Sequence, residues 1–421
     1  MFNYQTLENK LRVITVPLKE TKAVTVLVMA KVGSRYEAQD NRGISHFIEH
    51  MMFKGTKKRP DTLALSKELD GIGAEFNAFT AKDHTGYYVK ADASHLDLAL
   101  DLLTDMLYNS KFEDKELEKE KGVIIEEMNM YHDNPLMYTE DLFEQSIYQG
   151  NKLGWDIIGT KETISSMTRL KMINYLNQHY TDGNLIVGIA GAIDKSILKK
   201  VNHYFNSKNI GKPEQKFSRF ALKQNKKRVK IMHKETEQAQ IGLGFPAYGY
   251  GHKDLHAFQL LSVILGGNMS SRLFVNIRGK QGLCYYIKCQ PNVYQDTGNL
   301  YIQAGLDKNK IEKAIRLILE ELKKVIKNGA TEAELQKAKD FIKGKTILAL
   351  EDSLHLAEWY AKQAIFEREI LTPEKRFKLF DAVVKADILR VAKDIIKGNK
   401  INLAVIGPYK DNQKFEKLLV F

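Results

Sequence analysis

A single internal repeat constrains the fold of this chain more than any other feature of its sequence. Short apolar segments of the first half recur in the second half about 216 residues later, and the first of them is followed by Lys-Glu-Thr in both halves, at residues 19–21 and 234–236. A spacing this long is typical of a duplicated domain, because solenoid repeats are only about 20–50 residues long. The matched segments are residues 11–14 and 228–231, 24–28 and 241–245, and 184–191 and 402–407.

The region between the two copies is polar and contains Gly and Pro, which is typical of a linker. Each copy combines alternating strands, such as Val24–Val28, with long amphipathic helices, such as Ile311–Leu322. We therefore predict an α+β chain with an N-terminal half at 1–206, a linker at 207–227 and a C-terminal half at 228–421. For a chain with two such halves joined by a linker, we predict an active site between them.

Charge and cysteine usage restrict the partners and the compartment. The net charge of +12 would suit a nucleic-acid binder, but the Lys residues alternate with acids, as in residues 114–121, and form no basic patch. No apolar run reaches the roughly 18 residues that span a bilayer. Cys284 and Cys289 are five apart on an expected strand and face opposite sides, so they do not pair. We predict a cytoplasmic protein without nucleic-acid or membrane partners.

The segment His46-Phe47-Ile48-Glu49-His50 carries the clearest chemical signal. On a helix, His46 and His50 lie one turn apart on the same face, where both imidazoles reach one metal ion, and Glu49 lies close to that face. The surrounding residues are apolar nearly all round, which is typical of a buried helix. Burying these polar groups costs several kcal/mol unless they are paired or bind a metal. The segment therefore predicts a zinc site.

A catalytic zinc needs a third protein ligand. Glu120 and Glu127 are seven residues apart and so share one face of an expected helix, while Glu126 points elsewhere. One of the pair would bind the metal and the other would orient the site.

These segments together resemble the family of pitrilysin, insulin-degrading enzyme and mitochondrial processing peptidase, the inverzincins. The resemblance covers residues 46–56, then Glu120 to Glu127, and in the second half residues 266–274 with Arg278 and Tyr285. It implies two homologous halves, each with a mainly antiparallel sheet flanked by helices. It also implies one Zn²⁺ per chain, with Glu127 as the third ligand and Glu120 as an acid that orients a ligand without binding the metal itself.

The family resemblance further implies a zinc metallopeptidase. Glu49 would be the general base toward the zinc-bound water, and Arg278 and Tyr285 would contact the substrate and the developing oxyanion. Residues 73–80 and 85–89 read as a hairpin. In the family such an edge strand, here with Asn77, Ala78 and Phe79, pairs with an extended peptide or unfolded polypeptide.

Because the chain carries both the zinc residues and the Arg/Tyr pair, the resemblance favours a homodimer or a self-sufficient chain. Two alternatives remain open at this point. One is a non-catalytic or partner-dependent subunit of a processing-peptidase-like complex, and the other is a nucleic-acid binder that rests on charge alone.

Overall fold

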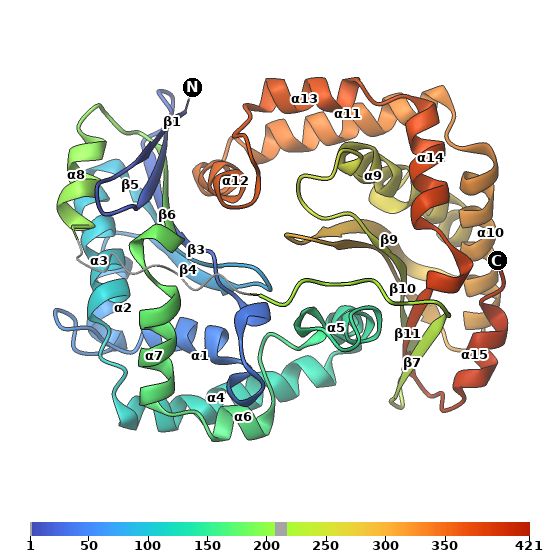
Figure 1. The fold of residues 1–421 in the computed structure, drawn as a ribbon, viewed down its shortest axis with the longest axis horizontal. Helices are drawn as coiled ribbons and strands as arrows, with labels where there is room; N and C mark the ends of the chain where they lie inside the picture. Colours follow the sequence, from blue (N-terminus) through green and yellow to red (C-terminus); the bar gives the residue numbers. More distant parts are fainter. Residues whose placement is uncertain (1, 207–216) are drawn as a thin grey trace. The chain divides into compact units, whose positions relative to one another are not determined.

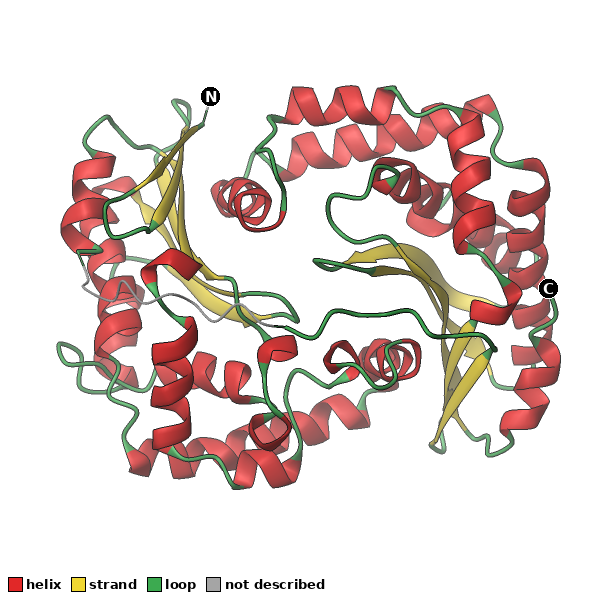
Figure 2. Ribbon diagram, in the orientation of Figure 1, coloured by secondary structure: helices red, strands yellow, loops and turns green. Residues whose placement is uncertain are grey.

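The computed structural model describes residues 2–206 and 217–421, so residues 207–216 of the predicted linker lie outside the described residues. The chain divides into two compact units, each built around one β-sheet (Figures 1 and 2). Unit 1 comprises Met1–Met128, Trp155–Ser218 and Ile347–Thr372, and unit 2 comprises Asn129–Gly154, Arg219–Thr346 and Pro373–Phe421. None of the helices in the described part of the chain is long and apolar enough to cross a membrane.

Apart from the additional edge strand β1 in unit 1, the two sheets share one topology. The strand order is β1-β2-β6-β3-β5-β4 in unit 1 and β7-β11-β8-β10-β9 in unit 2. The strands of unit 1 are β1 (Asn3–Thr6), β2 (Arg12–Pro17), β3 (Ala23–Ala30), β4 (Glu75–Thr80), β5 (Thr85–Asp92) and β6 (Leu185–Gly191). Those of unit 2 are β7 (Arg228–His233), β8 (Gln238–Ala247), β9 (Cys284–Val293), β10 (Gly298–Asp307) and β11 (Asn402–Gly407).

The predicted repeat corresponds to this shared topology. It matches β2 with β7, β3 with β8 and β6 with β11, and both members of each pair hold the same place in their sheets. The pairs β2–β6 and β7–β11 are parallel, whereas the other pairings among the described strands are antiparallel. The prediction of two homologous α+β halves with mainly antiparallel sheets is therefore confirmed.

The helices flank these sheets. Those before the linker are α1 (Ile44–Met52), α2 (Thr62–Asp70), α3 (Leu96–Asn109), α4 (Asp114–Asp133), α5 (Pro135–Ile147), α6 (Lys161–Ser165), α7 (Arg169–His179) and α8 (Ile197–Tyr204). Those after it are α9 (Leu255–Ser262), α10 (Ile311–Asn328), α11 (Glu332–Ala349), α12 (Ser353–Phe366), α13 (Pro373–Asp381), α14 (Lys385–Ile395) and α15 (Asn412–Leu418).

In unit 1 the alternation along β3 sends side chains to two different cores. Val26 and its alternate neighbours join the core with α1 and α3, whereas Leu27 and Met29 pack against α12. Gly188 on β6 permits this close approach, because a Cβ atom there would lie 3.2 Å from the carbonyl oxygen of Ala357. A helix from the C-terminal half of the sequence thus covers one face of the N-terminal sheet.

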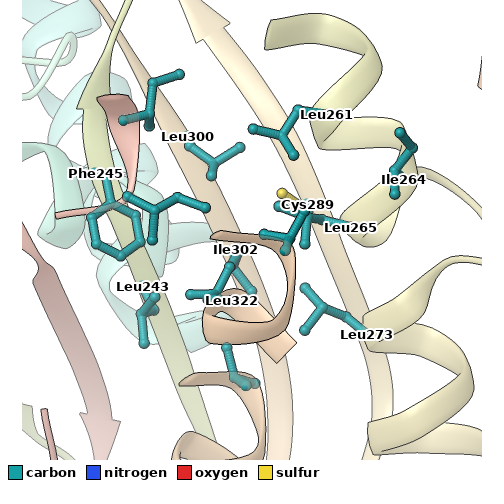
Figure 3. Packing of buried hydrophobic residues seen from close by; sticks show 14 of the residues in the cluster. Leu243, Phe245, Leu261, Ile264, Leu265, Leu273, Cys289, Leu300, Ile302 and Leu322 are labelled. Atoms are coloured by element: carbon teal, nitrogen blue, oxygen red, sulfur yellow. The ribbon is translucent and has the colours of Figure 1, made fainter. Parts of the chain in front are cut away.

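Unit 2 shows the reciprocal arrangement. One face of its sheet forms the large core of Figure 3, where residues of β8, β9 and β10 pack against α9, the segment after it and α10. The labelled residues are Leu243, Phe245, Leu261, Ile264, Leu265, Leu273, Cys289, Leu300, Ile302 and Leu322. The other face packs against α5, with Phe143 beside Tyr301. The compact units therefore exchange α5 and α12 relative to the predicted halves 1–206 and 228–421.

Candidate metal centre

Helix α1 carries His46, Glu49 and His50 and is anchored in the core of unit 1 by its fully buried apolar residues. Its first turn is held by Glu37, whose carboxylate accepts hydrogen bonds from the backbone N–H groups of Gly43 (2.8 Å) and Ser45 (3.0 Å). These N–H groups have no partner inside a helix, so a buried acid there stabilises the helix start. Burial raises the pKa of Glu37 to about 7, against the hydrogen bonds that lower it.

Three predicted ligands converge on one point. Glu127 Oε2, on α4, lies 3.7 Å from His46 Nε2 and 3.4 Å from His50 Nε2. One ligand atom from each residue falls within 4.8 Å of the others. Two ligands about 2.0–2.1 Å from a tetrahedral zinc ion are about 3.4 Å apart, so this spacing suits zinc.

The surroundings of these atoms also fit a metal. Glu127 Oε2 is buried, and within the described residues its 3.4 Å contact with His50 Nε2 falls short of a well-formed hydrogen bond. A buried carboxylate oxygen without a donor is costly, and a cation would compensate for this cost. Two imidazoles and one carboxylate are a common donor set for catalytic zinc, because they leave a fourth position open.

Glu120 supports the site from behind His50. Its Oε1 is 2.9 Å from His50 Nδ1 and its Oε2 is 2.6 Å from Lys54 Nζ. With Nδ1 protonated toward Glu120, the lone pair of Nε2 is available for a metal. Sequence reasoning missed Lys54, which lies just beyond the end of α1 at Met52.

The two histidines have opposite electrostatic environments in the metal-free site. Burial, reinforced by the neighbouring His50, lowers the pKa of His46 to about 4. Burial also disfavours charge on His50, but the hydrogen bond to Glu120 and the close polar contact with Glu127 outweigh it and raise its pKa to about 9. The same contact with His50 holds the pKa of Glu127 below its usual range. When no metal is bound, we therefore expect His50 to hold a proton near neutral pH.

Zinc affinity is consequently expected to depend on pH. A zinc ligand must be a neutral imidazole, so binding below pH 9 releases the proton of His50. The apparent association constant for zinc should rise about tenfold per pH unit between about pH 6 and 8, whereas His46 adds no slope in that range. Competition with a chelator of known affinity at each pH measures this slope.

The control for this measurement is Glu126→Gln, which removes an exposed acid next to Glu127 and should keep the slope. An association constant that stays constant between pH 6 and 8 would contradict the assignment of the stored proton to His50.

Glu49 faces β4 from α1. Burial raises its pKa, while a hydrogen bond from Thr80 lowers it; the hydroxyl Oγ1 of Thr80 donates to Glu49 Oε2 at 2.5 Å. A carboxyl group with a raised pKa beside a metal site is suited to accept and return a proton. Thr80 was not among the predicted site residues, and the sequence contains no local signal for this contact.

Strand β4 carries the predicted substrate residues Asn77, Ala78 and Phe79, and it forms one edge of its sheet. The backbone N–H of Ala81 donates to the carbonyl oxygen of His84. In an antiparallel ladder the backbone groups of alternate residues point to the same side, so those of Phe79 and Asn77 bond to β5. The backbone N–H and C=O groups of Ala78 then point to the free edge of the sheet. The N–H of Ala78 donates to the side-chain Oδ1 of Asn77 at 2.8 Å. The outward N–H of Ala78 is thus already hydrogen-bonded, but to the side chain of Asn77, which can rotate away.

Arg278 and Tyr285 lie in unit 2. Arg278 belongs to a π-helical segment, Phe274–Gly279, and its guanidinium carbon lies 4.7 Å from the ring centre of Phe274 and 5.6 Å from that of Tyr285. Tyr285 is 77% exposed and sits where the register of β9 with β10 shifts, so it is the extra residue of a β-bulge. Bulges re-aim side chains. The role of this pair toward a substrate stays a prediction.

Comparison with known proteins identifies the same regions. Residues 12–161 match the family model described as insulinase, peptidase family M16, and residues 166–341 match the model described as the peptidase M16 inactive domain. An uncharacterized zinc protease of Bacillus subtilis is 35% identical over 84% of this chain and 85% of its own length. Another, from Streptomyces coelicolor, is 32% identical over 97% of this chain and 90% of its own.

A solved structure agrees with these matches. The crystal structure of a protease from Helicobacter pylori superimposes with a TM-score of 0.90 and 27% identity. The superposition covers 97% of this chain and 100% of that one.

Proposed function

Because the chain belongs to peptidase family M16 and similar proteins from Bacillus subtilis and Streptomyces coelicolor are named zinc proteases, we propose that it is a zinc-dependent endopeptidase that cleaves peptides or unfolded polypeptides. The observation that carries the proposal is the convergence of His46, His50 and Glu127 beside Glu49. Profiling the cleavage of a peptide library by the purified, zinc-loaded chain tests it. Cleavage at internal bonds supports the proposal, and an intact library contradicts it.

The proposed mechanism assigns one task to each group. Zinc, when bound to His46, His50 and Glu127, supplies a Lewis acid that polarises the scissile carbonyl and acidifies water. Glu49 accepts the proton of the attacking water and passes it to the leaving amine. Glu120 holds the imidazole of His50 in the protonation state that a ligand needs.

The free edge of β4 supports binding of the substrate as an added strand. An extended peptide pairs with an exposed sheet edge mainly through backbone hydrogen bonds, so recognition depends on extension more than on sequence. Such pairing requires the outward N–H of Ala78, and Asn77 would first have to release it. Folded proteins offer few free extended segments, which favours short or unfolded substrates.

Replacing Ala78 by Pro is expected to raise KM for a cleaved peptide about tenfold or more, because it removes an outward N–H and leaves the pairing with β5 in place. The matched variant Asn77→Pro removes an N–H that faces β5 and should mainly lower the melting temperature. Steady-state kinetics and thermal unfolding of both variants measure the difference. An unchanged KM in a folded Ala78→Pro variant would contradict edge pairing.

We also propose that the chain acts as a homodimer in the cytoplasm. The three zinc residues and the Arg278/Tyr285 pair are present in one sequence, so no different subunit is needed to supply either set. The rival is a subunit that is inactive without a different partner chain. Gel filtration combined with a peptidase assay on the same fractions separates the two: activity in a peak of twice the chain mass favours the homodimer, and an inactive peak favours the rival.

A further inference from the structure

The last residue of β4 is hydrogen-bonded to the proposed base. Thr80 Oγ1 donates to Glu49 Oε2, and this is the only side-chain hydrogen bond that Glu49 makes within the described residues. The terminal torsion of a Glu side chain is broad, so a carboxylate without a partner samples many orientations. A single donor therefore determines which oxygen of Glu49 is engaged and which is left for chemistry.

The hydrogen bond belongs to a larger contact between β4 and α1. Alternate side chains of a strand share a face, and on β4 the face with Phe76, Ala78 and Thr80 is directed at α1. Phe76 lies 6.3 Å, ring centre to ring centre, from Phe53 just after α1, and Ala78 is buried in the same core. Thr80 is the polar member of this face and the one that reaches Glu49.

Phe79 shows the opposite orientation and so supports this register. Its ring centre lies 5.8 Å from that of His84, and it packs with the core that includes α12. A shift of β4 by one residue would exchange its two faces and direct Phe79, which has no hydroxyl group, toward Glu49 in place of Thr80. The contact between Thr80 and Glu49 is therefore possible in one register of β4 only.

We propose that Thr80 is a positioning residue for catalysis. Its hydroxyl holds Oε2 of Glu49, which leaves Oε1 to accept the proton of the attacking water. Since Thr80 is part of the strand that would pair with the peptide, it also aligns the base with the bound substrate. This inference rests on the proposed peptidase function and extends it to a residue outside the zinc ligands and the base.

The test compares Thr80→Val, which keeps the shape and removes the hydroxyl, with Thr80→Ser, which keeps the hydroxyl. With a quenched fluorescent peptide that the wild-type chain cleaves, Thr80→Val should lower kcat about 10–100-fold and change KM less than about twofold. Thr80→Ser should recover kcat to within about threefold of wild type. Zinc content and melting temperature are measured for each variant.

The control is Thr25→Val. Thr25 lies on β3 of the same sheet, and the change removes the buried hydrogen bond between its hydroxyl and that of Ser353 on α12 (2.7 Å). Thr25 aligns through Lys90 with Glu75, at the other end of β4, and its replacement should leave kcat unchanged. Wild-type kcat in Thr80→Val overturns the inference, as does a loss that Thr80→Ser fails to restore or that zinc release accompanies. If Glu49→Gln is inactive at the same time, the proposed function stands without Thr80; if Glu49→Gln is fully active, the proposed function itself fails.

Discussion

Replacing Glu49 by Gln is expected to lower the rate of peptide cleavage at least about a thousandfold and to leave the zinc content unchanged. The amide is close in shape to the carboxylate but cannot accept a proton, and general acid–base groups contribute about 10²–10⁴-fold to such reactions. A thousandfold loss corresponds to about 4 kcal/mol of transition-state stabilisation. Glu49 is not one of the three residues whose ligand atoms lie within 4.8 Å of one another, which supports the separation of catalysis from metal binding.

Two measurements check this result on the same preparation. Cleavage of a fluorescent peptide gives the rate, and metal analysis of the dialysed protein gives the zinc content. Glu126→Gln, an equally conservative change at an exposed acid of α4, is the matched control and should keep the wild-type rate. A Glu49→Gln variant that retains more than about a tenth of the wild-type rate would show that another group accepts the proton.

Replacing His50 by Ala is expected to abolish zinc retention. Structural zinc sites with four ligands bind with about 10–16 kcal/mol, so one ligand accounts for about 3 kcal/mol, or more than a hundredfold in Kd. The loss should be larger than the average because Glu120 and Lys54 lose their connection to the site together with the imidazole. Peptide cleavage should disappear with the metal.

A graded series of variants makes this expectation specific. Glu120→Gln removes support but no ligand, and outer partners of zinc ligands typically contribute about 10–100-fold to affinity. The expected order of zinc affinity is therefore Glu126→Gln equal to wild type, then Glu120→Gln, then Glu127→Gln and His50→Ala. Chelator competition at one pH measures all four. Full zinc occupancy in His50→Ala, or Glu120→Gln weaker than Glu127→Gln, would reverse the ligand assignment.

Much of the fold could be predicted from patterns within short stretches of the sequence. Strand alternation located β3 and β8, and helical periodicity located α10, because these patterns depend on which side of a single element is buried. The repeat of three strand segments was enough to predict two halves of one topology. The exchange of α5 and α12 between the compact units was not accessible in this way, since an apolar helix face does not specify which sheet it covers.

The metal site divides in the same manner. The sequence alone determined that His46, Glu49 and His50 lie together, because residues three and four apart on a helix are neighbours whatever surrounds the helix. From the residues alone, either Glu120 or Glu127 was possible as third ligand, and the family resemblance chose between them. The packing of α4 against α1 directs Glu127 to both Nε2 atoms and Glu120 to the Nδ1 of His50.

The contacts that complete the site were decided only by tertiary structure. Lys54 reaches Glu120 across some 66 residues of sequence and Thr80 reaches Glu49 across 31, and neither distance is encoded in a local pattern. Such contacts follow from how deeply α1 lies in the core and from the register of β4, which depend on many packed side chains at once. Local periodicity therefore placed the ligand pair, and the packing of separate elements placed the groups that orient it.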